Sequence, residues 1–102
     1  IARMRLFADA DGVMNLDLSQ VQGEVLLISQ FTLHASTAKG NRPSYIRAAR
    51  PEKAMPLYEA CIELLSAALG KQVKSCVFGA DMKVILVNDG PVTIVIDSKR
   101  KE

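Results

Sequence analysis

Apolar residues between positions 51 and 69 follow the spacing of an amphipathic helix. They recur every three or four positions, at Ala54, Leu57, Tyr58, Cys61, Leu64, Leu65 and Ala68. This spacing places them on one stripe of a helix that lies on a sheet. Pro51 suits a first helical turn and Gly70 a helix end, but Pro56 lacks the N–H that an interior position needs. The pattern predicts one helix that ends at Gly70 and whose regular part starts near Met55.

Short aliphatic runs predict the strands. They lie at residues 25–28, 73–77, 83–87 and 92–96, and residues 3–8 fit a short strand or a helix end. The uninterrupted run Val25–Ile28 is typical of a strand covered on both faces. Asp and Gly at residues 9–12 indicate a turn, and the polar, basic residues 34–50 indicate a long loop. The chain is therefore expected to form a single α+β unit with at least four strands.

Composition excludes several classes of protein. The chain has 102 residues, near the size of one small domain, so a multidomain enzyme is excluded. Hydrophobic residues make up 49% and charged residues 24%, the balance of a globular protein rather than a disordered one. A net charge of +2 is too small to indicate a nucleic-acid partner, so any such contact must come from clustered charges.

Cysteine and histidine usage excludes further sites. Cys61 and Cys76 form neither a disulfide framework nor a CxxC pair, and His34 is the only histidine, so we expect no metal and no cofactor. No apolar run approaches the ~20 residues that cross a bilayer, and the N-terminus has no signal-peptide layout. These features favour a reduced, soluble, cytoplasmic protein without a membrane partner.

Three hydrogen-bonding side chains close the first aliphatic strand, at Ser29, Gln30 and Thr32. Functional sites are often built from the side chains and N–H groups at a strand end. A strand that runs into a turn stabilised by Ser and Thr is the simpler interpretation, and the residues alone favour it. A hydrolytic triad of Ser29, His34 and Asp81 has no support from their spacing, and His34 is expected to be a solvated surface residue.

The segment Asn88-Asp89-Gly90-Pro91-Val92-Thr93 joins the last two aliphatic runs. A hairpin loop explains Asn, Asp and Gly at these positions. Gly90-Pro91 offers an alternative, because an X-Pro bond can be cis. Such a bond would aim two consecutive carbonyls in one direction, where they could hold an ammonium group.

Six stretches resemble one known family, in the order in which the family carries them. They are Met14-Asn15-Leu16, Ser29-Gln30-Phe31-Thr32-Leu33, Lys39-Gly40-Asn41-Arg42-Pro43-Ser44, Leu57-Tyr58-Glu59, Phe78-Gly79-Ala80-Asp81-Met82 and Asn88-Asp89-Gly90-Pro91-Val92-Thr93. The chain is similar to the D-aminoacyl-tRNA deacylases over essentially its whole length. The resemblance implies a hydrolase that releases D-amino acids, and also glycine, wrongly esterified to tRNA. This is a chiral proofreading step of translation.

The resemblance also implies an architecture. Family members have an α+β fold in which a long amphipathic helix packs on a β-barrel-like mixed sheet, and they form homodimers with the active site at the subunit interface. They carry further strands before the position of Ile1, so residues 1–102 correspond to a single deacylase domain that spans the C-terminal two thirds of the family fold, with its N-terminal strands missing. Without those strands, we expect an exposed apolar surface or a partner chain that covers it.

Residue roles follow from the matched motifs. The resemblance assigns the ester pocket to Ser29, Gln30, Phe31 and Thr32, and chiral selection to Gly90 and Pro91, which would reach into the partner's pocket. It assigns the terminal adenosine of the tRNA to Phe78 and Met82, with Asn88 and Thr93 completing the substrate-binding set. Cys76 departs from the family, which usually has Gly there; its thiol could narrow the pocket or face the core.

Two catalytic schemes are open. Thr32 is one candidate nucleophile, and hydrolysis assisted by the terminal 2′-OH of the RNA is the other. We favour the second, because a threonine hydroxyl is a weak nucleophile unless a base activates it, and the only histidine, His34, is expected to be a solvated surface residue. The main-chain N–H groups of Phe31 and Thr32 would then stabilise the oxyanion.

Clustered cations offer a binding surface for RNA. Lys39, Arg42, Arg47 and Arg50 lie within twelve residues of one loop, where they could hold the phosphates of the acceptor stem; a solvated basic loop is the simpler alternative. The alternative to an enzyme is a non-catalytic module on the same fold that binds RNA or protein. A thiol enzyme that uses Cys61 or Cys76 is a weaker one.

Overall fold

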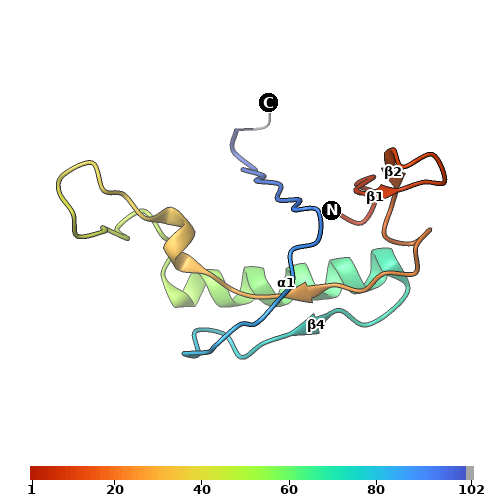
Figure 1. The fold of residues 1–102 in the computed structure, drawn as a ribbon. Coiled ribbons are helices and arrows are strands. Elements are labelled where there is room, and N and C mark those ends of the chain that lie inside the picture. Colours follow the sequence, from red (N-terminus) through yellow and green to blue (C-terminus); the bar gives the residue numbers. More distant parts are fainter. Residues whose placement is uncertain (101–102) are drawn as a thin grey trace.

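A single long helix organises this computed structural model, which describes residues 1–100 (Figure 1). Helix α1 (Pro51–Leu69) ends at Gly70, which has a φ of 65°, so the predicted stop is confirmed. The predicted start near Met55 is wrong, because Pro56 lies inside the helix. The carbonyl that Pro56 leaves without a helical partner belongs to Glu52, an exposed residue of the first turn, where water can bond it.

Two small sheets accompany the helix. Strands β1 (Phe7–Ala8) and β2 (Met14–Leu16) form an antiparallel hairpin across the predicted turn at residues 9–12. Strands β3 (Leu26–Leu27) and β4 (Lys74–Ser75) are parallel, with Leu26 opposite Lys74 and Leu27 opposite Ser75. Parallel strands need a long crossover connection, and α1 lies in this one. The fold is therefore mixed α and β, as predicted.

The core is very small. Leu65 on α1 and Val73 before β4 are the buried apolar residues of the described chain, with 8% and 2% of their surface exposed. The accessible surface is 9167 Å², whereas a compact protein of 11.1 kDa exposes about 5,700 Å². The radius of gyration is 16.0 Å, against about 13 Å for a compact chain of this length. The helix and strands thus form an open framework.

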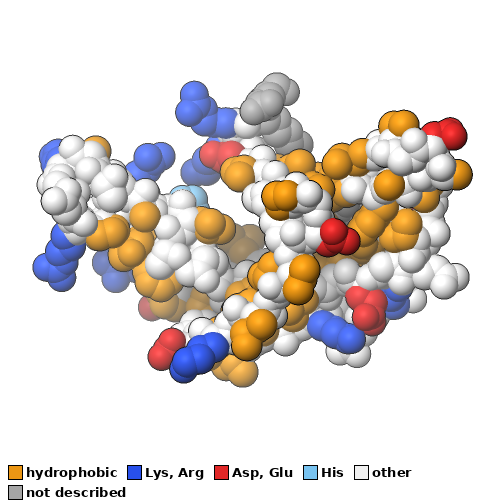
Figure 2. Space-filling view, viewed as in Figure 1, with side chains coloured by type: hydrophobic (Ala, Val, Ile, Leu, Met, Phe, Trp, Pro, Cys, Tyr) orange, Lys and Arg blue, Asp and Glu red, His pale blue; other side chains and the backbone are white. Residues whose placement is uncertain are grey.

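Much apolar surface remains uncovered, which confirms the expectation of an exposed apolar surface. Ile85, Val87 and Val95 each expose 90% or more of their surface. Figure 2 shows hydrophobic side chains spread over the face in view, including the extended segment that crosses in front of the helix in Figure 1. In strand β3, Leu26 is 56% exposed, so the prediction of a strand covered on both faces is wrong for this chain.

Two predicted strands, at residues 83–87 and 92–96, are absent from the part of the chain that the structure describes. Between them, the Asn88 side chain accepts a hydrogen bond from the Val92 N–H, so these groups close a local turn instead of a hairpin ladder. Apolar, β-branched sequences favour an extended chain, but a strand also needs a paired neighbour. Among residues 1–100 no sheet closes into a barrel, so the expected barrel-like sheet is not seen.

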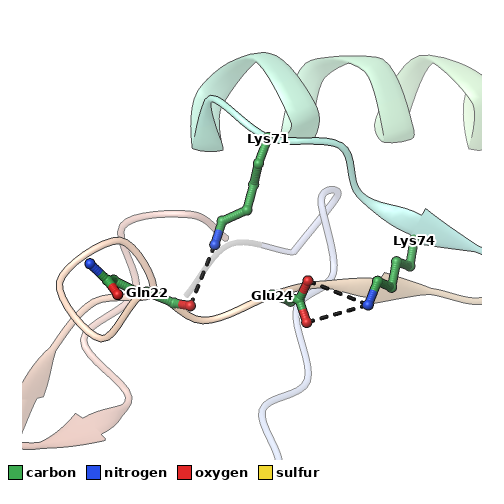
Figure 3. A network of polar contacts seen from close by, with 4 residues as sticks. All are labelled: Gln22, Glu24, Lys71 and Lys74. Atoms are coloured by element: carbon green, nitrogen blue, oxygen red, sulfur yellow. Dashed lines mark hydrogen bonds and ion pairs between the residues drawn. The ribbon is translucent and has the colours of Figure 1, made fainter.

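A surface network holds the segment before β3 against the residues before and in β4 (Figure 3). The ammonium group of Lys71 donates to the main-chain oxygen of Gln22 over 3.4 Å. Lys74 lies 3.4 Å from the carboxylate of Glu24. Both members of that ion pair are exposed, so it adds at most about 1 kcal/mol. These contacts supplement the parallel β3–β4 ladder at its solvent side.

Candidate active site

A pocket of about 650 Å³ opens at one end of α1. Three chain segments form its walls: residues 29–31 after β3, residues 48–51 at the start of α1, and residues 78–80 after β4. These segments lie far apart in the sequence. The parallel pairing of β3 and β4 brings the first and third together, because both strands end at the same edge of the sheet. Apolar and polar groups from separate motifs therefore face one cavity.

The first wall carries most of the predicted catalytic residues. Ser29, Gln30 and Phe31 line the pocket, and Phe31 begins a short 3-10 helix, η1 (Phe31–His34). Thr32 is half-buried just behind them, and its hydroxyl accepts a hydrogen bond from the Gln30 side chain. The N–H groups of Phe31 and Thr32 open η1, where no earlier helical carbonyl exists, and residues 1–100 provide no partner for them.

Aromatic residues shape this part of the pocket. The ring of Tyr45 packs edge-on against Phe31, with centroids 5.0 Å apart. On the opposite wall, Phe78 lies 5.7 Å from the ring of Tyr58. Phe78 therefore lines the pocket, whereas Met82 is half-buried and lies outside the lining. That the two residues hold the terminal adenosine stays a prediction. The pocket has aromatic surfaces on both sides, which suits a flat ring system.

The segment 88–93 forms a separate exposed turn. The Gly90–Pro91 peptide bond is cis, and Gly90 has a φ of 132°. Asn88 holds the turn together: its side-chain oxygen lies 3.1 Å from the Val92 nitrogen, and its NH₂ group donates to the Thr93 hydroxyl over 3.3 Å. None of these residues lines the pocket of the same chain. This predicted part of the site thus lies outside the pocket that residues 29–31 line.

The predicted phosphate-binding cations lie on the loop between η1 and α1. Lys39, Arg42 and Arg47 are exposed, and Figure 2 shows Lys and Arg side chains gathered at the end of the molecule that this loop occupies. Two hydrogen bonds of 2.9 Å between Ser36 and Ser44 close the loop. Arg50, at the base of α1, lines the pocket itself. One of the four predicted cations therefore lies at the pocket, and the loop itself reaches the pocket at Tyr45 and Ala48.

Among the polar and aromatic residues that line the pocket, sequence reasoning missed three, namely His34, Tyr45 and Tyr58. His34 is exposed, as expected, but it lies at the pocket wall. Tyr58 was predicted on the apolar stripe and in a family stretch but without a role in the site, although a tyrosine hydroxyl on such a stripe needs a polar partner and therefore indicates a buried contact. The Cys76 thiol does not line the pocket; only its main chain is engaged, by Tyr58.

The structure also bears on metals and membranes. Within residues 1–100, no three His, Cys, Asp or Glu side chains are grouped closely enough to hold a metal ion. In the same part of the chain, no helix combines the length and the apolar character that a membrane span requires.

Several proteins similar in sequence to this chain are named D-aminoacyl-tRNA deacylase. The family model of D-Tyr-tRNA(Tyr) deacylase matches residues 1–97. The D-aminoacyl-tRNA deacylase of Porphyromonas gingivalis is 62% identical over 102 residues, which cover 100% of this chain and 68% of that protein. The enzyme of the same name from Bacteroides fragilis is 63% identical over the same shares of both chains. That of Akkermansia muciniphila is 62% identical over 101 residues, 99% of this chain and 67% of that protein.

A solved structure is also similar to this chain. The c-Myc DNA Unwinding Element Binding Protein superposes with a TM-score of 0.84 at 37% identity, over 96% of this chain and 66% of that one. The chain thus spans about two thirds of the length of the proteins that it matches. Identity near 60% over the full chain shows that the chain and these deacylases are members of one family. The chain belongs to the D-aminoacyl-tRNA deacylase family.

Proposed function

We propose that the pocket between residues 29–31 and 78–80 is where this chain hydrolyses D-aminoacyl-tRNA. Family membership assigns the reaction, which is hydrolysis of the ester that joins a D-amino acid to tRNA. The enzyme class is therefore a hydrolase that acts on ester bonds. The observation that carries the location is the meeting of two separate family motifs at one cavity. The aromatic face of Phe78 would hold the terminal adenosine, and the ester would lie toward Gln30 and Phe31.

Catalysis in this pocket needs little covalent chemistry from the protein. An aminoacyl ester is already reactive, so positioning and stabilisation of the oxyanion supply most of the acceleration. The unpartnered N–H groups of Phe31 and Thr32 suit an oxyanion. The Thr32 hydroxyl receives a hydrogen bond from the Gln30 amide, which is no base, and this supports hydrolysis assisted by the RNA 2′-OH over a threonine nucleophile.

Chiral selection would come from a second subunit. The turn at Gly90 and Pro91 lies outside the pocket of its own chain, which favours a homodimer in which the turn enters the partner's pocket. There the two carbonyls would face the amino group and the α-hydrogen of the substrate. An L side chain would collide with the main chain, whereas glycine has no side chain to collide. The uncovered apolar surface provides area for such an interface.

The basic loop would bind the tRNA itself. Lys39, Arg42 and Arg47 are exposed on the loop that reaches the pocket at Tyr45 and Ala48, and they would contact the acceptor stem if its 3′ end occupies the pocket. Phosphate contacts fix the position of a nucleic acid without reading its sequence. This is what an enzyme acting on many different tRNAs requires.

One assay tests the proposal. D-Tyr-tRNA, L-Tyr-tRNA and Gly-tRNA are each incubated with the protein, and the release of free amino acid is measured. Hydrolysis of the D-Tyr and glycyl esters, with L-Tyr-tRNA spared, is the expected result. Binding of tRNA without turnover would instead support a non-catalytic RNA-binding module. Analytical ultracentrifugation of the same sample tests the homodimer.

A further inference from the structure

The hydroxyl of Tyr58 lies at the point where β3 and β4 separate. Its oxygen is 2.9 Å from the Leu27 carbonyl oxygen and 3.1 Å from that of Cys76, and the Cys76 nitrogen is 3.3 Å away. A hydroxyl carries one proton, so it donates to one carbonyl, the nearer being Leu27, and accepts the Cys76 N–H. One side-chain group therefore joins both strands.

The place of this contact relates directly to the pocket. Regular pairing ends with Leu27 opposite Ser75, and the chains then diverge. Ser29, the first residue of one pocket wall, follows Leu27 by two positions, and Phe78, the first residue of the other wall, follows Cys76 by two positions. The Tyr58 hydroxyl thus forms hydrogen bonds with Leu27 and Cys76, each of which lies two positions before a pocket wall. It also lies on the rigid helix α1, and its ring packs beside Phe78.

We propose that Tyr58 is a positioning residue, which sets the separation of the two pocket walls and so aligns the ester with the N–H groups of Phe31 and Thr32. This inference rests on the proposed function of the pocket. Loss of the hydroxyl leaves the Cys76 N–H and the Leu27 carbonyl without a shared partner, and the two walls can then move apart. Small displacements of a bound ester lower the rate of its reaction.

A matched control exists on the same helix. The Ser66 hydroxyl accepts a hydrogen bond from the N–H of Val73 over 3.0 Å. It therefore joins α1 to the beginning of the β4 segment, as Tyr58 joins α1 to its end. Ser66→Ala and Tyr58→Phe each remove one hydroxyl and one connection between the helix and this segment. Only Tyr58 is near the pocket, so the pair separates an effect on stability from an effect on position.

The test measures kcat, KM and the midpoint of thermal unfolding for both variants with D-Tyr-tRNA, below the unfolding range of each. Tyr58→Phe should lower kcat about tenfold and leave the preference for D over L esters intact, since Gly90 is untouched. Ser66→Ala should lower the unfolding midpoint and keep kcat within about twofold of wild type. Wild-type kcat in Tyr58→Phe, or an equal loss of kcat in both variants, overturns the proposal.

A second measurement does not depend on turnover. Amide chemical shifts of Tyr58→Phe should move at both walls, residues 29–31 and 78–80, and those of Ser66→Ala should not. Shifts confined to Leu27 and Cys76 contradict a positioning role. If the wild-type protein hydrolyses no D-aminoacyl-tRNA, the proposed function fails, and these shifts alone decide whether Tyr58 sets the separation of the walls.

Discussion

Gly90 and Val92 lie so close that a β-carbon built on Gly90 would be 2.9 Å from Cγ2 of Val92 and 3.1 Å from its main-chain nitrogen. Gly90 also has a φ of 132°, which L side chains rarely adopt. Both facts make glycine necessary at this position of the turn. Any side chain here must displace Val92 or change the main chain that would face the substrate.

Replacing Gly90 with alanine should therefore impair deacylation. We expect Gly90→Ala to lower kcat/KM for D-Tyr-tRNA at least about tenfold, because the added methyl group displaces the turn. Gly12→Ala is the control: Gly12 also has a positive φ, of 76°, but the β-carbon that alanine adds there would meet no atom within 4 Å. Equal activity of the two variants would contradict a role for the turn in catalysis or selection.

Thr32 separates the two catalytic schemes. Its hydroxyl is bonded to the Gln30 amide, and within residues 1–100 no base is hydrogen-bonded to it, so Thr32→Ala should keep activity within about fivefold of wild type. Thr32→Ser, which retains the hydroxyl, serves as the control. If the alanine variant folds and loses all turnover while the serine variant is active, threonine is the nucleophile and the RNA-assisted scheme is wrong.

The basic loop should give the reaction its sensitivity to salt. Neutralising Lys39, Arg42 or Arg47 with glutamine should raise KM for tRNA and lower the slope of log KM against log salt concentration by about one for each phosphate that is no longer bound. Lys74→Gln removes the same charge from the Glu24 pair and should leave the slope unchanged. Identical slopes in all four variants would mean that the loop is only solvated.

Substitution of two adjacent leucines tests whether the core of this chain is as small as the structure shows. Leu65 is 8% exposed and Leu64 is 72% exposed. Leu65→Ala should lower the free energy of unfolding by about 2–4 kcal/mol, whereas Leu64→Ala should change it by less than about 0.5 kcal/mol. Denaturant titration followed by circular dichroism at the helix signal measures both. A comparable loss in Leu64→Ala would show that another chain covers the exposed face of α1 in solution.

The β1–β2 hairpin should depend on pH through Asp9. Its carboxylate accepts hydrogen bonds from the Val13 N–H, the Asn15 side chain and the Asp11 N–H, and these bonds lower the pKa of Asp9. A lowered folded-state pKa means that the stabilisation is complete above the unfolded-state pKa and is lost as the pH falls through the folded-state one. Protonation removes the acceptor.

The hairpin should accordingly lose this stabilisation as the pH falls through the lowered folded-state pKa of Asp9. Amide exchange of Val13, followed by NMR as the pH is lowered, reports this loss. Asp9→Asn carries no titrating group, so its hairpin should show no such transition. A transition of the same size in Asp9→Asn would assign the effect to another carboxyl group.

Local physics explains which elements the sequence predicted well. The end of α1 at Gly70 follows from the apolar period and the left-handed glycine, both of which act within a few residues. The turn before β2 follows from Asp9 in the same way. The helix start was placed too late at Met55, because the lost hydrogen bond of Pro56 lies at an exposed first turn, where water offsets it.

The pairing of strands, in contrast, could not be predicted from the sequence. Residues 83–87 and 92–96 have the composition of strands, yet in the part of the chain described here they find no neighbour to pair with. Pairing depends on residues far away in the sequence, and a run of valine and isoleucine does not specify its partner. The same holds for β3, whose apolar run predicted cover on both faces although Leu26 is largely exposed.

The sequence by itself determined the family, because six ordered motifs are a property of the chain and need no folding. It also nominated Gln30, Phe31 and Phe78 as site residues. Only the tertiary structure decided that Phe31 and Phe78 face one pocket, that the turn at Gly90 lies outside it, and that the Tyr58 hydroxyl joins both strands below it. Such contacts join residues distant in sequence, so they exist only once the strands and the helix have packed.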